Sequence, residues 1–171
     1  TACRNLFAQA MMDADRHGHR IAVLILSIDN FKKVNDILGS ENGDMLMRLV
    51  ADRLQYVVGA VGTLARIGGD EFTIVLGRIA QAEEAARVAQ RVISGFSEPF
   101  NIVEQDLFLT TSIGIAIYPD DAGDVESSLK NADIALHLAK TMDRNAYRYF
   151  TADMNTRAVE RLSMETALHR A

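Results

Sequence analysis

The chain has 171 residues, of which 49% are hydrophobic and 24% charged, which is enough material for one packed domain and too little for two. Its formal net charge of −5 argues against a basic nucleic-acid binder, and its longest apolar run, Ile21–Leu26, is far shorter than the ~18 residues of a membrane span. One cysteine, Cys3, allows no internal disulfide, which fits a cytoplasmic domain. The charge and the apolar runs lead us to expect no nucleic-acid or membrane contacts. Because the first residue is Thr1 rather than Met, we also expect a piece of a longer protein.

The first third of the chain predicts a helix, a buried strand and a second helix. Residues 5–17 predict a helix that ends at Gly18. Residues 21–28 are almost continuously apolar and rich in β-branched side chains, which is typical of a central strand covered on both faces. Residues 43–58 predict a helix because their apolar residues recur at helical spacing: Met45, Leu46, Leu49, Val50, Leu54 and Val57.

A hairpin is predicted next, from two strand-like runs at 63–67 and 70–76 on either side of Gly68-Gly69. Glycine adopts positive φ at both turn positions without a steric penalty. The remaining pattern predicts a helix, two strands, a helix, a short strand and a last helix, at 81–96, 99–103, 107–118, 127–142, 145–150 and 151–171.

The order strand, helix, hairpin, helix, strand is that of a split βαβ unit. We therefore predict an α+β fold of the palm or ferredoxin-like kind, with a mixed central sheet and helices packed around it. Because this plan hosts many functions, the function has to be inferred from the site.

Several motifs, in order and at matching spacing, carry a resemblance to a known family. Arg66-Ile-Gly-Gly-Asp-Glu-Phe72 resembles the signature that names the GGDEF family of diguanylate cyclases. It is accompanied by further family motifs: Ile28–Asp36, Gly43-Asp44, Thr111–Ile115, Ala132–Leu136, Ala139-Lys140 and Arg144-Asn145. We expect residues 1–150 to form the GGDEF domain. Residues 151–171 resemble the helix that leads to an EAL phosphodiesterase domain, which implies a tandem GGDEF–EAL parent protein.

The resemblance implies a reaction between two GTP molecules that forms cyclic di-GMP. Each subunit of a homodimer brings one GTP, and Mg²⁺ or Mn²⁺ neutralises charge on the phosphates and activates the attacking oxygen. In such phosphoryl transfer, positioning and electrostatics supply most of the catalysis.

The resemblance also implies the catalytic and metal-binding residues. Asp70 and Glu71 are the expected catalytic carboxylates and metal ligands, together with the main-chain carbonyl of Ile28. Gly68 and Gly69 would let a phosphate approach the backbone closely. The alternative is a plain hairpin with acidic residues at its tip.

Asn35 and Asp44 match the guanine-reading positions of the family. A carboxylate accepts hydrogen bonds from the base, and an amide both donates and accepts. The alternatives are an Asx turn or N-cap for Asn35 and a helix N-terminal carboxylate for Asp44.

Lys140 and Arg144 match residues that hold the tail phosphates of GTP. They are four residues apart, and we expect them on one face of one helix. Lys32 is a further phosphate candidate. The alternative for these cations is a solvated face near a helix C-terminus.

Ser27 is the most informative departure from the family pattern, because active members have a metal-binding Asp at the matching position. A hydroxyl is a poorer Mg²⁺ ligand than a carboxylate, and even changes around a metal's ligands cost ~10–100-fold in affinity or activity. Asp29 follows two residues later but need not point to the same place.

Two functional hypotheses follow. The favoured one is a GTP-binding module that regulates an attached EAL phosphodiesterase, with cyclase activity weak or lost because of Ser27. The alternative is a working diguanylate cyclase, which the intact Asp70 and Glu71 favour. A dimerisation module without a ligand is a third class, and it leaves Asn35 and Asp44 unexplained.

Overall fold

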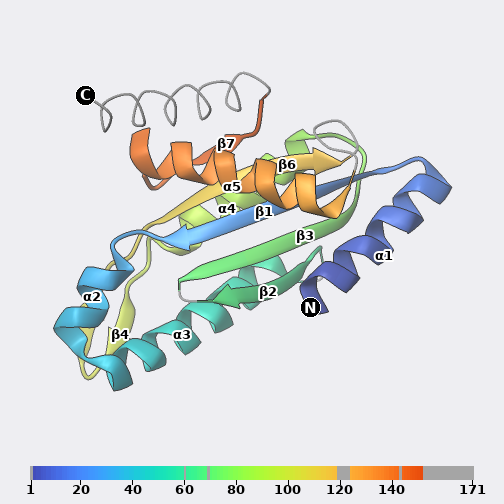
Figure 1. The fold of residues 1–171 in the computed structure, drawn as a ribbon. Helices are drawn as coiled ribbons and strands as arrows, with labels where there is room; N and C mark the ends of the chain where they lie inside the picture. Colours follow the sequence, from blue (N-terminus) through green and yellow to red (C-terminus); the bar gives the residue numbers. More distant parts are fainter. Residues whose placement is uncertain (1, 60, 69, 119–123, 143, 152–171) are drawn as a thin grey trace, which may run out of the picture.

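The computed structural model describes residues 2–59, 61–68, 70–118, 124–142 and 144–151, and Figure 1 shows their arrangement. In chain order the elements are α1 (Ala2–His17), β1 (Arg20–Ile28), α2 (Phe31–Leu38), α3 (Ser40–Val58), β2 (Thr63–Gly68), β3 (Glu71–Ile79), α4 (Glu83–Gly95), β4 (Phe100–Ile102), β5 (Gln105–Leu107), β6 (Thr111–Tyr118), α5 (Val125–Met142) and β7 (Tyr147–Tyr149).

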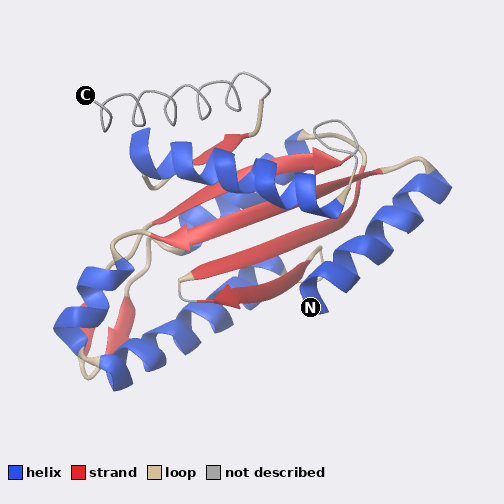
Figure 2. Cartoon of the chain, viewed as in Figure 1, coloured by secondary structure: helices blue, strands red, loops and turns tan. Residues whose placement is uncertain are grey.

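The main sheet has five strands in the order β2-β3-β1-β6-β7, coloured red in Figure 2. Strand β1 is antiparallel to β3 and β6, and β2 is antiparallel to β3. Strand β7 joins β6 in parallel, which makes the sheet mixed. The predicted α+β class and split βαβ plan are therefore confirmed.

Helices cover both faces of this sheet, and β1 contributes side chains to both cores. Leu24 and Leu26 belong to a core shared with α3 and α4, whereas Val23 and Ile25 belong to a core shared with α1 and α5. This alternation follows from the two-residue period of a strand. Residues 21–28 are all buried, as the apolar run predicts.

Helix α5 lies directly against β6 at Gly114. A Cβ at this position would overlap the Ala132 carbonyl oxygen and the Leu136 amide nitrogen, so only glycine lets the helix approach the strand this closely. Figure 1 shows that the C-terminal end of α5 and the C-terminal end of β1 lie at the same end of the sheet.

Several predicted boundaries are wrong. The helix predicted over 43–58 begins three residues earlier, and α2 was not predicted, because its eight residues include none that is fully buried. The strand predicted over 107–118 is divided between β5 and β6. Strands β4 and β5 form a separate two-stranded sheet whose turn residues, Val103 and Glu104, have φ of 51° and 63°. They lack the Asn-Gly signal of such turns.

The predicted hairpin of β2 and β3 forms. Gly68, which was predicted to lie in the turn, is instead the last residue of β2 and pairs with Glu71. Gly69 and the helix predicted over 151–171, apart from residue 151, lie outside the described residues. Among the helices that the structure describes, none has the length and apolar character required to cross a membrane.

Candidate functional site

The candidate site lies where β1 ends, β3 and β6 begin, and the C-terminal end of α5 passes over the sheet. On the sheet face that carries α5, the side chains of β1 change from apolar to polar at Ser27. By strand alternation, Glu71 of β3 and Ser112 of β6 lie on the same face. A polar patch therefore ends the apolar core at this edge.

Ser27 and Asp70 are in direct contact across the β1–β3 junction. The fully buried Ser27 Oγ donates a hydrogen bond to Asp70 Oδ2 at 3.3 Å. The Ile28 amide donates to the Asp70 carbonyl oxygen at 3.2 Å, and Ser27 pairs with Glu71 in the strand register. The structure thus brings Ser27, Ile28, Asp70 and Glu71 together, and position 27 faces Asp70.

Glu71 is half-buried in a locally acidic environment. Burial raises the pKa of its carboxyl group above the ordinary value, and the charges of Asp133 and Asp70 raise it further, while Lys140 lowers it. Asp133 was not among the residues predicted to belong to the site. It lies in the motif Ala132–Leu136, but no residue near it in sequence indicates that it lies close to Glu71. A cation bound here would relieve the repulsion between these carboxylates.

The oxygen donors at this edge fit a Mg²⁺ ion only in part. Mg²⁺ is commonly held by one or two carboxylates together with substrate phosphates, and Asp70, Glu71 and the Ile28 carbonyl are donors of that kind. Within the part of the chain that the structure describes, however, no group of three or more His, Cys, Asp or Glu residues could hold a metal ion. The donor set therefore suits one ion shared with phosphate oxygens.

Asp29 does not replace the missing carboxylate, because its oxygens are occupied elsewhere. Its Oδ2 accepts hydrogen bonds from Thr110 Oγ1 at 2.7 Å and from the Asn145 amide at 3.1 Å. Its Oδ1 accepts from Ser112 Oγ at 2.7 Å. Asp29 points toward β6 and the segment after α5, and its side chain is buried.

Asn35 and Asp44 lie where α2 meets α3. The half-buried Asn35 side chain lies against Gly43, since a Cβ at position 43 would overlap Asn35 Oδ1. Asp44 is the next residue along α3 and is exposed. Both polar groups therefore border the same helix junction.

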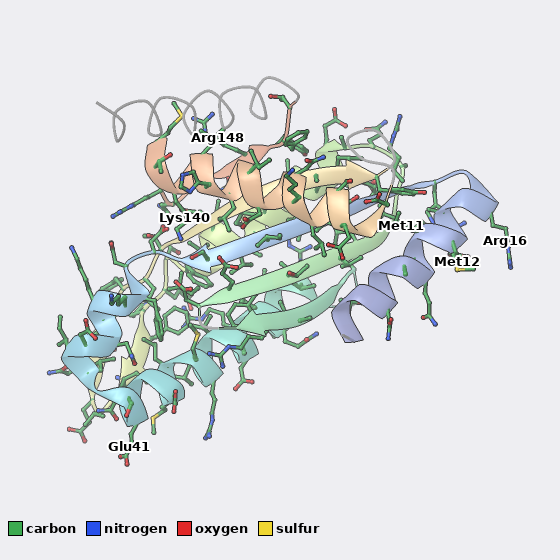
Figure 3. All side chains as sticks on the ribbon, in the orientation of Figure 1. Met11, Met12, Arg16, Glu41, Lys140 and Arg148 are labelled. Atoms are coloured by element: carbon green, nitrogen blue, oxygen red, sulfur yellow. The ribbon has the colours of Figure 1, made fainter. Side chains whose placement is uncertain are left out.

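The prediction that Lys140 and Arg144 share one helix face is wrong. Helix α5 ends at Met142, and Arg144 has a left-handed φ of 48°. Its Nη1 instead donates to Asn30 Oδ1 at 3.1 Å, directly after β1. Lys140 is half-buried on the last turn of α5, at the end that overlies the end of β1 (Figure 3). Lys32 is exposed in the first turn of α2.

Comparisons with known proteins agree on one family. The sequence model of the family described as diguanylate cyclase, GGDEF domain, matches residues 1–146. The cyclic di-GMP phosphodiesterase NbdA of Pseudomonas aeruginosa is 36% identical over 171 residues, which are 100% of this chain and 22% of NbdA. The bifunctional diguanylate cyclase/cyclic di-GMP phosphodiesterase MucR of the same organism is 38% identical over 163 residues, 95% of this chain and 24% of MucR.

Solved structures agree with this result. The structure of the GGDEF domain of TpbB from Pseudomonas aeruginosa superposes with a TM-score of 0.87 at 30% identity, covering 92% of this chain and 91% of that one. The chain therefore matches a whole domain in that structure but spans only 22% and 24% of the length of NbdA and MucR.

Proposed function

Because the chain belongs to the GGDEF domain family of diguanylate cyclases, we propose that it binds GTP and regulates an attached EAL phosphodiesterase domain, with its own cyclase activity weak or lost. The observation that carries this proposal is the Ser27–Asp70 hydrogen bond of 3.3 Å. A hydroxyl occupies the place from which a second carboxylate would face Asp70. The missing charge weakens the metal site more than the nucleotide site.

The nucleotide would lie along the edge of the sheet. Asn35 and Asp44 would read the guanine, while Lys32, Lys140 and Arg144 would hold the tail phosphates, and Gly68 and Gly69 would let phosphate approach the backbone. Asp70, Glu71 and the Ile28 carbonyl would hold Mg²⁺ or Mn²⁺, which supplies charge neutralisation on the phosphates. The cation side chains lie on three different segments, α2, α5 and the turn after α5.

The regulatory role is supported by the lengths and names of the relatives. NbdA and MucR, both named as phosphodiesterases, match 100% and 95% of this chain, which spans only 22% and 24% of their lengths. We propose that residues 151–171 connect this domain to an EAL domain in a cytoplasmic bacterial protein. Any catalysis would need a homodimer, because two GTP molecules must face each other.

A working diguanylate cyclase is the second candidate. Asp70 and Glu71 are present and adjacent to Ser27, and MucR is named as bifunctional. The two candidates differ in one property, which is whether GTP bound at this site is converted to cyclic di-GMP.

The variant Ser27→Asp separates the candidates. It places a second carboxylate in a fully buried position opposite Asp70, which we expect to cost about 1–3 kcal/mol of stability without divalent metal. Mg²⁺ or Mn²⁺ should restore the thermal midpoint of Ser27→Asp. With the metal present, this variant should form cyclic di-GMP at least about tenfold faster than the unsubstituted chain.

The matched control is Ser94→Asp, an exposed position on α4, which should change neither quantity. If the unsubstituted chain already forms cyclic di-GMP as fast as Ser27→Asp does, the proposed defect is wrong and the cyclase candidate stands.

A further inference from the structure

Asp29 is a buried carboxylate whose hydrogen bonds join three segments that are distant in sequence. Its side chain is 5% exposed. Its donors are the Thr110 hydroxyl just before β6, the Ser112 hydroxyl in β6 and the Asn145 amide after α5. Its own amide donates to the Thr110 carbonyl oxygen at 2.9 Å. The three donors occupy both carboxyl oxygens of Asp29.

The segments joined by Asp29 carry unusual backbone conformations. Asn30, Arg144 and Asn145 have φ of 58°, 48° and 49°. Asparagine tolerates this left-handed region, whereas a residue such as arginine adopts it only when its surroundings impose it. The turn that carries Arg144 therefore depends on contacts from outside the turn.

Three contacts hold this turn in place. The Arg144 amide donates to the Ala139 carbonyl oxygen at 2.7 Å, and the Arg144 side chain donates to Asn30 Oδ1 at 3.1 Å. The next amide, that of Asn145, donates to Asp29 at 3.1 Å. Asp29 thus fixes the turn from its C-terminal side and also directly precedes Asn30, the side-chain partner of Arg144.

We propose that Asp29 is a positioning residue that holds the guanidinium of Arg144 at the exit of β1, where it recognises the tail phosphates of a guanine nucleotide. This inference rests on the proposed GTP-binding function. A cation held in its binding geometry loses less conformational freedom when a ligand arrives, which raises affinity for the group that it contacts. Asp29 therefore increases the preference for GTP over GMP, which lacks the tail phosphates.

The test compares GTP and GMP affinities of the 171-residue chain by calorimetry at fixed Mg²⁺. Asp29→Ala leaves the Asn145 amide without its acceptor, and we expect GTP affinity to fall about tenfold or more. Asp29→Asn keeps one acceptor oxygen and should give an intermediate loss. GMP affinity should change by less than about twofold in both variants, because the base contacts are unchanged and GMP lacks the tail phosphates that Arg144 holds.

A double substitution shows whether Asp29 acts through Arg144. In an Arg144→Ala background, Asp29→Asn should cause no further loss of GTP affinity. Asp52→Asn, an exposed carboxylate on α3, is the matched control and should preserve both affinities. If Asp29→Ala does not fold, the GTP-to-GMP ratio of Asp29→Asn decides the matter.

Equal losses for GTP and GMP, an unchanged ratio, or a further loss in the Arg144→Ala background would each overturn the positioning role. In those cases the unsubstituted chain still binds GTP and the proposed function stands. If the unsubstituted chain binds neither nucleotide, both the proposed function and the positioning role of Asp29 are overturned.

Discussion

At the scale of single residues, the chemistry of this domain depends on how charge is distributed around the end of β1. Ser27 supplies a neutral hydroxyl opposite Asp70, and Asp29 is committed to hydroxyl and amide donors on the other side. Glu71 remains beside Asp70, with Asp133 near it and Lys140 as the compensating cation. We therefore propose Asp70 and Glu71 as the two carboxylates that bind a metal.

Glu71→Gln tests the electrostatics of this cluster. The pKa of Glu71 is raised in the folded chain, first by burial, so its charge disfavours folding once the pH exceeds that raised pKa. Without divalent metal, the variant should have a higher thermal midpoint at neutral pH, and the gain should vanish below the ordinary carboxyl pKa. The gain should be small because the group is partly solvated.

The measurement is the thermal midpoint across a pH series, with the exposed Glu104→Gln as control. A midpoint that falls at neutral pH, or a difference that does not depend on pH, would contradict this description of Glu71.

Sequence motifs indicated candidate residues but not their geometry. The resemblance placed Ser27 at the position of a metal-binding Asp, and the structure shows that its hydroxyl lies 3.3 Å from Asp70. The placement of Arg144 was wrong, because a spacing of four residues says nothing about a left-handed turn that ends the helix first. The hydrogen bonds of Asp29 could not be predicted from the sequence either, because its partners are distant in the chain. Thr110, just before β6, and Ser112 in β6 lie more than 80 residues away, and Asn145 lies further still.

At the scale of elements, the junction of α2 and α3 determines where the expected guanine readers lie. Gly43 leaves room for the Asn35 side chain, and Gly39, with φ of 85°, separates the two helices. The sequence predicted α3 from its apolar stripe, whereas α2 is short and has no fully buried residue. Its position is set by packing against α3, which a local pattern does not record.

Gly43→Ala is the variant that tests this junction. The added Cβ would displace the end of the Asn35 side chain, which is flexible enough to move. We expect the chain to fold with a loss of about 1 kcal/mol from mild overpacking. GTP affinity should fall about tenfold, because the displaced Asn35 side chain no longer forms its hydrogen bond with the guanine base.

Gly77→Ala is the matched control, since its Cβ would meet only the Ala10 Cβ at 3.9 Å. Unchanged GTP affinity in Gly43→Ala, measured beside that control, would show that Asn35 does not read the base.

At the scale of the whole molecule, the split βαβ order brings distant segments to one edge of the sheet. The sequence predicted this order because the strands and the helices between them differ in the spacing of their apolar residues. Strands β1 and β6 are buried along nearly their full length. The sequence did not predict that β4 and β5 form a sheet of their own. The edge that results brings together, from different elements, the residues proposed to read guanine and bind phosphate and the acidic residues beside them.

We propose that this domain binds GTP but converts little of it to cyclic di-GMP. The most direct test measures GTP binding and cyclic di-GMP formation on one sample of the 171-residue chain with Mg²⁺ or Mn²⁺. Asp44→Ala serves as the binding control and Asp70→Ala as the turnover control. We predict GTP binding that Asp44→Ala weakens at least about tenfold, with cyclic di-GMP no higher than in Asp70→Ala. Cyclic di-GMP formation well above that control, or no GTP binding at all, would contradict the account.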